Sequence, residues 1–280
     1  MLVNTKDILT DAQKGQYAVA AFNVYNLETA QAAIQVSERE GTPVIIALGE
    51  RYFPTVDVEG FSSMIKAMAE KVKVPVSLHL DHAYEKKSII RAIRCGFNSV
   101  MYDGSKYSLE QNIHFTKEIV EIAHMAGVSV EAEIGSTARG AFSDEEEGNG
   151  TLTDPDSAKV FVAETNVDFL AASIGTVHGM YKGEPKIDLA LLEKIRQTVG
   201  IPLVLHGGSG TPEDTLKKAI QLGICKVNVN TEISMAAVAF LQKYTEKKQM
   251  AHLSTIMSDM QQAMEPVMTK FVRLLANNKF

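Results

Sequence analysis

The 280-residue sequence predicts an α/β fold, a (β/α)8 TIM barrel with extra C-terminal helices. Short apolar runs rich in branched residues alternate with amphipathic segments along the chain. The run over residues 43–48 is apolar throughout, as is typical of parallel strands buried on both faces. No linker or change of composition separates two halves. We therefore expect a single barrel domain over residues 1–280, with a helical extension from about residue 250 to residue 280.

Each of eight apolar runs is followed by a segment with helical periodicity. We expect strands over residues 17–22, 43–48, 75–80, 98–102, 128–132, 169–173, 201–205 and 224–228. We expect helices over residues 27–39, 61–71, 85–94, 109–125, from 155 onward, 189–199, 212–222 and 232–246. Asp154 before Pro155 is a typical helix start. A doubly wound open sheet is the alternative that this alternation allows.

Composition limits the class of protein and its partners. The chain is 45% hydrophobic and 22% charged, which is ordinary for a globular protein. A net charge of −6 argues against nucleic acid or an anionic membrane as the main partner. Cys95 and Cys225 have no metal-ligand or redox spacing, so we expect buried, reduced thiols. With no signal peptide and no apolar stretch near the ~18 residues that span a bilayer, these features indicate a cytoplasmic protein.

The region beyond the eighth helix carries methionines at helical spacing. Met257, Met260, Met264 and Met268 predict one or two added helices that pack on the core or on another subunit. Pro266 lies within this stripe, and we expect it to kink or divide the helical region.

Polar residues with useful chemistry occur where the predicted strands end. They are Asp81, His82, Asp103, Glu133, His178, His206, Asn228 and Asn230. In a barrel, the carboxyl ends of the strands converge on one face, and such enzymes keep their active sites there. The sequence therefore predicts one polar site at that face.

Three of these residues are histidines: His82, His178 and His206. A single histidine is more often structural, but three from three strand ends can bind a tetrahedral zinc ion with a fourth position open. His79 lies two positions inside its strand, and we expect it to fill the barrel interior or to support a ligand.

Three carboxylates accompany the histidines. Asp81 directly precedes His82, so we expect it to transfer a proton beside the metal. Asp103 and Glu133 could form a second, oxygen-rich metal position or orient the histidine ligands. The alternative for each carboxylate is a solvated loop charge or a helix cap.

A glycine-rich turn follows His206, with the sequence Gly207-Gly208-Ser209-Gly210. Its glycines allow backbone N–H groups to converge on an anion, and Ser209 adds a hydroxyl donor. A histidine beside such a turn indicates a metal next to a phosphorylated substrate. A plain strand-to-helix turn would have the same pattern.

A polar stretch over residues 136–151 interrupts the alternation. Loops of about this length without structure of their own are usually functional or disordered. The stretch contains the acidic run Asp144-Glu145-Glu146-Glu147. This run is either a solvated charge cluster or part of a loop that closes over the site.

Five motifs in this order carry a resemblance to a known family: His79-Leu80-Asp81-His82, Val130-Glu131-Ala132-Glu133-Ile134-Gly135, His178-Gly179, His206-Gly207-Gly208-Ser209-Gly210 and Asn228-Val229-Asn230-Thr231-Glu232. From Asn4 to about Ala237, the chain resembles the class II, zinc-dependent ketose-bisphosphate aldolases, which include fructose-bisphosphate and tagatose-bisphosphate aldolases. The resemblance implies reversible cleavage of a phosphorylated ketose to dihydroxyacetone phosphate and an aldehyde.

The resemblance also implies roles for individual residues. His82, His178 and His206 match the ligands of the catalytic zinc, which polarises the ketose carbonyl and stabilises the enediolate. Asp81 matches the aspartate that exchanges a proton with the C4 oxygen. Asp103 and Glu133 match a second or alternative metal position. The matches to contacts with dihydroxyacetone phosphate are Gly179, Gly207, Gly208, Ser209, Asn228, Asn230 and Thr231. A monovalent cation, Na⁺ or K⁺, is a further family feature, although no motif in this sequence defines its position.

Lys182 follows Gly179 closely in the chain. It could add a positive charge near the substrate phosphate, or it could be a solvated loop lysine.

Two departures from the family pattern concern the aldehyde half of the substrate. The family has a Gly-Gly-Glu-type motif after the fifth strand, whose glutamate moves the C3 proton. Here Glu145, Glu146 and Glu147 are the candidates, and Glu146 is the residue that we select. The C-terminus also lacks the Asp-Pro-Arg sequence and glycine-rich tail of close relatives. The sequence therefore leaves the aldehyde partner open.

Two other classes of function compete with an aldolase. One is a metal-dependent hydrolase on the same barrel, although the first strand lacks the His-x-His pair of some such enzymes. The other is a phosphosugar-binding protein that has lost turnover. A Schiff-base aldolase is disfavoured because the sixth strand contains no lysine. We expect a phosphosugar as the partner, no nucleic acid or membrane, and a homodimer or homotetramer.

Overall fold

The computed structural model of the chain describes residues 2–145, 148–246 and 251–280. Within these residues, eight parallel strands form a closed barrel in the order β1-β10-β9-β7-β5-β4-β3-β2. The barrel strands are β1 Val19–Asn23, β2 Val44–Gly49, β3 Val76–Ala83, β4 Ser99–Tyr102, β5 Ser129–Ile134, β7 Phe169–Ala172, β9 Leu203–Leu205 and β10 Ile224–Val229. The predicted barrel and its eight strands are confirmed, and the open sheet is excluded.

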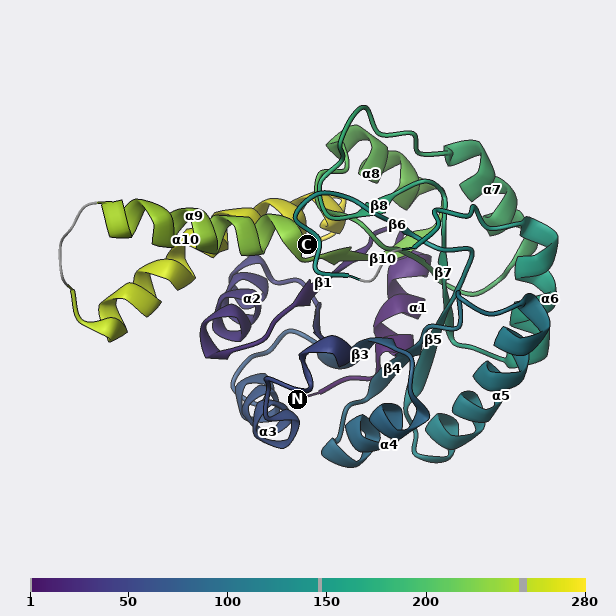
Figure 1. Cartoon of the computed structure of the whole chain (residues 1–280), viewed down its shortest axis with the longest axis horizontal. Coiled ribbons are helices and arrows are strands. Elements are labelled where there is room, and N and C mark those ends of the chain that lie inside the picture. Colours follow the sequence, from purple (N-terminus) through teal and green to yellow (C-terminus); the bar gives the residue numbers. More distant parts are fainter. Residues whose placement is uncertain (1, 146–147, 247–250) are drawn as a thin grey trace.

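A helix follows each barrel strand, and Figure 1 shows these helices surrounding the barrel. They are α2 Leu27–Glu40, α3 Val58–Ala69, α4 Lys86–Cys95, α5 Leu109–Met125, α6 Pro155–Thr165, α7 Leu189–Thr198, α8 Glu213–Gln221 and α9 Thr231–Glu246. A short 3-10 helix, η1 Glu50–Tyr52, comes between β2 and α3. The helix start at Asp154 is confirmed, because its side chain accepts a hydrogen bond from the backbone N–H of Ser157.

Strand β1 is apolar as far as Asn23 because the barrel buries both of its faces. In β1, Ala20 and Phe22 belong to the large core between strands and helices. The alternate residues Val19 and Ala21 belong to a second apolar cluster inside the barrel. Side chains that alternate along a strand therefore enter two different cores, which removes the polar half of the usual alternating pattern.

Helix α1 (Thr5–Gly15) precedes the first strand and was not predicted from the sequence. Its buried residues Ile8, Leu9 and Ala12 pack into the apolar cluster inside the barrel. Figure 1 shows α1 within the ring of strands. The helix closes the end of the barrel opposite the carboxyl ends of the strands, so a ligand enters from the other end.

Helix α10 (Leu253–Ala276) is a single helix that contains Pro266. Of the two effects expected of Pro266, a kink or a division of the helical region, the division does not occur, and one added helix forms. One face of α10 buries Met260, Met264 and Met268, and α10 packs against α2. This packing stabilises a continuous helix and outweighs the loss of the backbone hydrogen bond that a proline cannot donate. The prediction of core packing is confirmed for these three methionines, whereas Met257 is half-buried.

Two strands outside the barrel were also absent from the prediction. β6 (Ala138–Arg139) and β8 (Val177–His178) pair in parallel, with Arg139 opposite His178. This small sheet connects the long loop after β5 with the segment after β7. It brings His178 back over the mouth of the barrel, six positions beyond the end of β7 at Ala172.

The helices within the described ranges do not include one whose length and apolar character would allow it to cross a membrane.

Candidate active site

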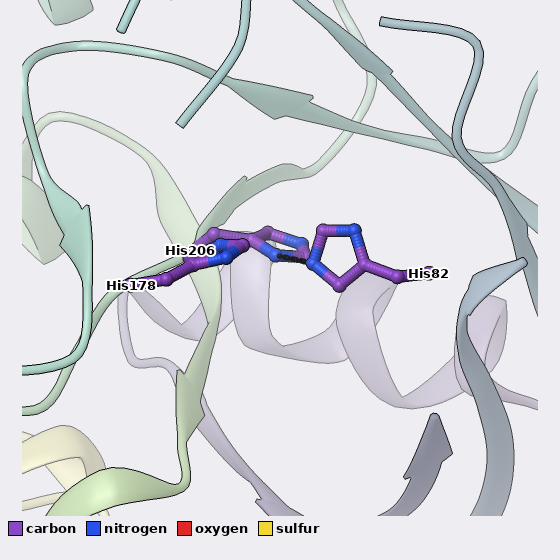
Figure 2. A group of neighbouring side chains, drawn as sticks. All are labelled: His82, His178 and His206. Carbon is purple, nitrogen blue, oxygen red and sulfur yellow. Dashed lines mark hydrogen bonds between the residues drawn. The ribbon is translucent and has the colours of Figure 1, made fainter. Parts of the chain in front are cut away.

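The three predicted histidines meet at the carboxyl ends of the barrel strands. His82 lies in β3, His178 lies in β8 and His206 follows β9. One ring nitrogen from each histidine lies within 4.8 Å of the other two, a group that could hold a metal ion. Figure 2 shows the three rings facing one another, with the hydrogen bond between His82 and His206 drawn as a dashed line.

A distortion of β3 allows Asp81 and His82 to face the same cavity. Neighbouring residues in a regular strand point to opposite faces of a sheet. His82 instead has a φ of 41°, and the pairing of β3 with β4 shifts register between Leu80 and Ala83. Both Asp81 and His82 line the cavity as a result. A left-handed backbone at a non-glycine residue is costly, and such conformations cluster at functional sites.

Buried carboxylates orient two of the histidine rings. His82 Nδ1 lies 2.8 Å from Asp103 Oδ2, and His206 Nε2 lies 2.8 Å from Glu131 Oε1. Each contact directs the opposite ring nitrogen inward, so His82 Nε2 and His206 Nδ1 approach to 2.8 Å. When each carboxylate accepts an N–H, the two inner nitrogens present lone pairs to the same space. This donor set fits a cation such as zinc.

The charges around the cluster shift its pKa values in opposite directions. Burial alone lowers the pKa of His82, but Asp81 and Asp103 outweigh burial and raise it to about 9. Burial and the positive charge of His82 lower the pKa of His178 well below 6.5, and they also lower that of His206. At neutral pH, His178 and His206 are therefore neutral rings, the form that binds metals.

A second group of potential ligands consists of His82, Asp103 and Glu133. Glu133 Oε1 accepts hydrogen bonds from the backbone N–H of Thr137 at 3.0 Å and from its hydroxyl at 3.2 Å. Glu133 Oε2 is buried without a hydrogen-bond partner among the described residues. Burial, followed by the charge of Asp103, raises the pKa of Glu133 to about 8. Two close carboxylates with an unpartnered oxygen fit a second cation position.

Asp81 is held by two amide side chains. Asn23 Nδ2 donates to Asp81 Oδ2 at 2.8 Å, and Asn228 Nδ2 donates to Asp81 Oδ1 at 3.0 Å. Burial raises the pKa of Asp81, but the positive charges of His82 and Lys226 outweigh burial and hold it well below 3.8. Asp81 is therefore an ionised proton acceptor in the cavity. The role of Asn23 was not predicted, although the sequence places it at the end of β1.

A polar cavity lies where the three histidines and Asp81 meet. It brings together most of the predicted site residues with several others. Its lining residues are Asn23, Asp81, His82, Ser143, Glu145, His178, Gly179, His206, Gly207, Gly208, Ser209, Asn228, Asn230 and Thr231. Lys182 is exposed and does not line this cavity, so the structure does not bring it to the predicted site.

The glycine-rich turn after His206 uses some of its N–H groups within the fold. The N–H of Gly208 donates to the carbonyl of Asn228 at 2.9 Å, and the N–H of Gly210 donates to Glu232 Oε1 at 2.7 Å. The described contacts leave the N–H groups of Gly207 and Ser209 without an acceptor, and the Ser209 hydroxyl, which accepts from the N–H of Glu232 at 3.2 Å, keeps its own proton to donate. Gly207 has a φ of 74°, which glycine adopts without the strain of a side chain.

The acidic run of the long loop also reaches this site. Glu145 is buried, lines the cavity and forms an ion pair with Arg51 of η1. Tyr52 donates a hydrogen bond to Asp144, and Asn230 Nδ2 donates to Asp144 Oδ1 at 3.3 Å. Glu146, the residue selected from the sequence, lies outside the described residues. Arg51 had not been predicted, because nothing in the sequence around η1 indicates that it meets a loop 94 positions away.

Comparison with known proteins identifies the family. Residues 3–279 match the family model of class II fructose-bisphosphate aldolases.

The chain belongs to that family.

Among similar sequences, a fructose-bisphosphate aldolase from Geobacillus stearothermophilus is 45% identical over 244 residues, which cover 84% of this chain and 83% of that protein. The crystal structure of the YdjI aldolase from Escherichia coli K12 has a TM-score of 0.88 and 33% identity, and the match covers 99% of this chain and 98% of the other. A putative fructose-1,6-bisphosphate aldolase from Coccidioides immitis has a TM-score of 0.89 and 31% identity, with 97% and 95% of the two chains covered.

Membership confirms the resemblance found in the sequence. Class II fructose-bisphosphate aldolases catalyse aldol cleavage of a ketose bisphosphate, and the chain is therefore a lyase. The family uses a metal, and the histidine and carboxylate groups described above are possible ligands for it. A barrel hydrolase of another family does not explain these matches.

Proposed function

We propose that this aldolase reversibly cleaves a ketose 1-phosphate or 1,6-bisphosphate to dihydroxyacetone phosphate and an aldehyde, with zinc as its metal. One observation carries the proposal: a single cavity is lined by three imidazoles, the Asp81 carboxylate and the turn from Gly207 to Ser209. These groups match the three needs of the reaction, which are an electrophile for the carbonyl, a proton acceptor and an anion cradle.

His82, His178 and His206 would hold the zinc ion. Three imidazoles with an open fourth position are typical of catalytic zinc sites, and neutral imidazole suits zinc better than it suits Mg²⁺ or Ca²⁺. When bound, zinc supplies a Lewis acid that polarises the ketose carbonyl. Asp103 and Glu133 would form a second or alternative metal position, which the buried, unpartnered Glu133 Oε2 supports.

The turn after His206 would bind the phosphate of the dihydroxyacetone half. The available donors are the N–H groups of Gly207 and Ser209 and the Ser209 hydroxyl, while Gly208 allows close approach of the backbone. We assign the remaining contacts to Gly179, Asn228, Asn230 and Thr231, all of which line the same cavity. A Na⁺ or K⁺ ion near this phosphate is part of the same proposal.

Asp81 would take the proton from the C4 hydroxyl during cleavage and return it during condensation. The amides of Asn23 and Asn228 fix its carboxylate, and its lowered pKa keeps it ionised. Because Asp81 and His82 are adjacent in β3, the proton acceptor and the metal would lie beside the same carbon–carbon bond.

A loop glutamate would move the C3 proton of the dihydroxyacetone half. Glu146 is the choice made from the sequence, and Glu145 is the glutamate of this run that the structure describes in the cavity. Separate Glu145→Gln, Glu146→Gln and Glu147→Gln variants should identify it. The glutamate responsible should lose deuterium exchange at C3 of dihydroxyacetone phosphate in D₂O, while the other two variants exchange normally. Normal exchange in all three would reduce the run to a solvated charge cluster.

The proposed reaction is tested by offering fructose 1,6-bisphosphate, tagatose 1,6-bisphosphate and several ketose 1-phosphates and measuring release of dihydroxyacetone phosphate. We expect release that EDTA abolishes, zinc restores and borohydride leaves unchanged. Turnover that resists EDTA would contradict the metal mechanism. Binding of these sugars without release would favour a phosphosugar-binding protein.

We also propose that the protein is a homodimer or homotetramer. Figure 1 shows α9 and the first part of α10 extending beyond the barrel, and α9 exposes Met235, Val238 and Leu241. Exposed apolar residues grouped on one helix are typical of subunit interfaces. Light scattering should give a mass of two or four chains, and Val238→Glu with Leu241→Glu should reduce it to one. A wild-type mass of one chain would contradict the proposal.

The compartment and pathway complete the proposal. A cytoplasmic protein of carbohydrate metabolism, acting in glycolysis, is consistent with two cysteines that form no disulfide. Fractionation of cells with a marker enzyme for the cytoplasm would test the location.

A further inference from the structure

A buried ion pair lies inside the barrel, next to the histidine cluster. Lys226 of β10 and Glu131 of β5 are both fully buried, and Lys226 Nζ lies 2.7 Å from Glu131 Oε2. Lys226 Nζ also lies 3.5 Å from Nε2 of His79, whose Nδ1 lies 2.7 Å from the hydroxyl of Ser99. None of these four side chains lines the active-site cavity.

This ion pair is connected directly to His206. The two oxygens of Glu131 have different partners, because Oε2 accepts from Lys226 while Oε1 accepts from Nε2 of His206. Lys226 therefore determines which way the Glu131 carboxylate is turned. The carboxylate in turn holds the proton of His206 on Nε2 and leaves Nδ1 facing His82.

Fold stability alone does not explain why these charges are buried. Removing two charges from water costs several kcal/mol per ion, and replacing a buried ion pair by apolar residues of similar volume is often neutral or stabilising. Nor does Lys226 have access to a substrate carbonyl, because it lies behind the histidines and is bound to Glu131. The remaining feature of the pair is its contact with His206.

We propose that Lys226 is a positioning residue for the metal centre, which anchors Glu131 so that His206 presents Nδ1 to the metal. The proposal rests on the proposed function only in taking His206 as a metal ligand. It predicts that a side chain which never touches substrate or metal controls metal affinity through one hydrogen-bonded carboxylate.

The test measures zinc affinity of the purified protein by competition with a chelator. Lys226→Met should weaken zinc binding about 10- to 100-fold, the range usual for loss of a residue that orients a metal ligand. Lys6→Met is the matched control, since Lys6 Nζ pairs with Asp168 at 2.9 Å, and neither residue belongs to the candidate ligand groups. It should leave zinc affinity unchanged.

A double variant separates anchoring from loss of charge. In Glu131→Gln with Lys226→Met, the Gln oxygen can still accept a hydrogen bond from Nε2 of His206. The Gln NH2 group no longer faces a second donor, because the Lys226 ammonium is absent. Zinc affinity should return to within about threefold of wild type. In Glu131→Gln alone, the amide cannot accept from both Lys226 and His206, so zinc binding should weaken as in Lys226→Met.

A spectroscopic measurement follows the ring itself. In ¹⁵N-labelled protein stripped of metal with a chelator, the ring nitrogens of His206 should report protonation at Nε2 in wild type and a mixture of tautomers in Lys226→Met. Unchanged zinc affinity or an unchanged tautomer in a folded Lys226→Met protein would overturn the proposal. If Lys226→Met does not fold, Glu131→Gln provides the same test, and normal zinc affinity in that variant would overturn the proposal equally.

The zinc and tautomer measurements do not depend on turnover. Wild-type protein that binds zinc with these effects but cleaves no ketose phosphate would contradict the proposed function and leave the role of Lys226 standing.

Discussion

The histidine cluster and the glycine-rich turn meet at His206, but they bind their ligands with different groups. The histidine cluster is made of side chains, and buried carboxylates orient two of its rings. The turn is made of backbone, and its geometry depends on Gly208, which packs against β10, and on Gly207, which packs against Val177 of β8. A site made of side chains can lose one hydrogen-bond partner while its backbone stays in place. A site made of backbone N–H groups loses its geometry when an added atom displaces the backbone.

This difference indicates where each half of the site is sensitive to change. The metal half should tolerate changes of shape but respond steeply to changes in charge and in hydrogen-bond acceptors. The phosphate half should tolerate changes in nearby charge but respond to a single added methyl group. The following predictions test this contrast, beginning with the largest effect.

The largest effect is expected from His206→Ala, which removes one of the proposed ligands. Lewis-acid stabilisation of a transition state is worth several kcal/mol, so kcat/KM should fall about 1000-fold or more. Zinc content of the purified variant should fall in parallel, measured by atomic absorption. Full activity with a normal zinc content would remove His206 from the metal site.

A large but different effect is expected from Gly208→Ala. The added Cβ would lie 2.5 Å from Val227 Cγ1 and 2.6 Å from the carbonyl of Asn228, so the turn must shift. We expect KM for the ketose phosphate to rise about 10- to 100-fold, from loss of one or two hydrogen bonds to a charged group, with zinc affinity near normal. Isothermal titration with dihydroxyacetone phosphate and with zinc would measure both. Equal weakening of the two would contradict a separate backbone-built half.

A moderate effect is expected from Asp103→Asn. The amide oxygen can still accept from His82 Nδ1, but the negative charge beside the ring is lost. Zinc affinity should fall about tenfold, while the affinity for dihydroxyacetone phosphate in the presence of saturating zinc should stay within about twofold. A change confined to phosphate binding would reverse the assignment of Asp103.

The smallest effect is expected far from both halves, in Arg273→Ala. Arg273 pairs with Glu40 across the contact between α10 and α2, and its exposure makes the pair weak. The hydrogen bond from Arg273 lowers the pKa of Glu40, so the stability that the pair adds is present at neutral pH and is lost as pH falls through that lowered value. Thermal unfolding midpoints of wild type and variant should differ by about 2 °C or less at pH 7 and converge in acid. Zinc affinity and kcat should not change.

Much of the fold could be read from the sequence because local patterns and tertiary structure agree in a barrel. Strands such as β2 and β7 are short runs of apolar residues, and helix caps such as Asp154 mark the boundaries. The elements missed from the sequence lack such a pattern. Helix α1 has few apolar residues, and they become meaningful only when Ile8 and Leu9 enter the barrel. The strands β6 and β8 have two residues each, too few to form a pattern.

The site divides in the same way. Residues at strand ends, such as Asp81 and His206, could be predicted because the barrel brings all carboxyl ends to one face. Arg51 and Lys226 could not, because their roles depend on contacts with residues 94 and 95 positions away. Lys182 was selected for its position after Gly179, but sequence distance does not determine which way an exposed loop side chain points.

The sequence by itself determined the barrel, the order of its strands along the chain, the family and the set of polar residues at one face. These depend on periodicity and on motifs whose members are close in sequence. Only the tertiary structure decided which nitrogen of each ring faces its neighbour, that Glu145 reaches the cavity, and that a buried lysine stands behind His206. Those features arise from the closure of the barrel, which buries charged side chains from different strands together. Because water is excluded, each charged group interacts only with the side chains around it.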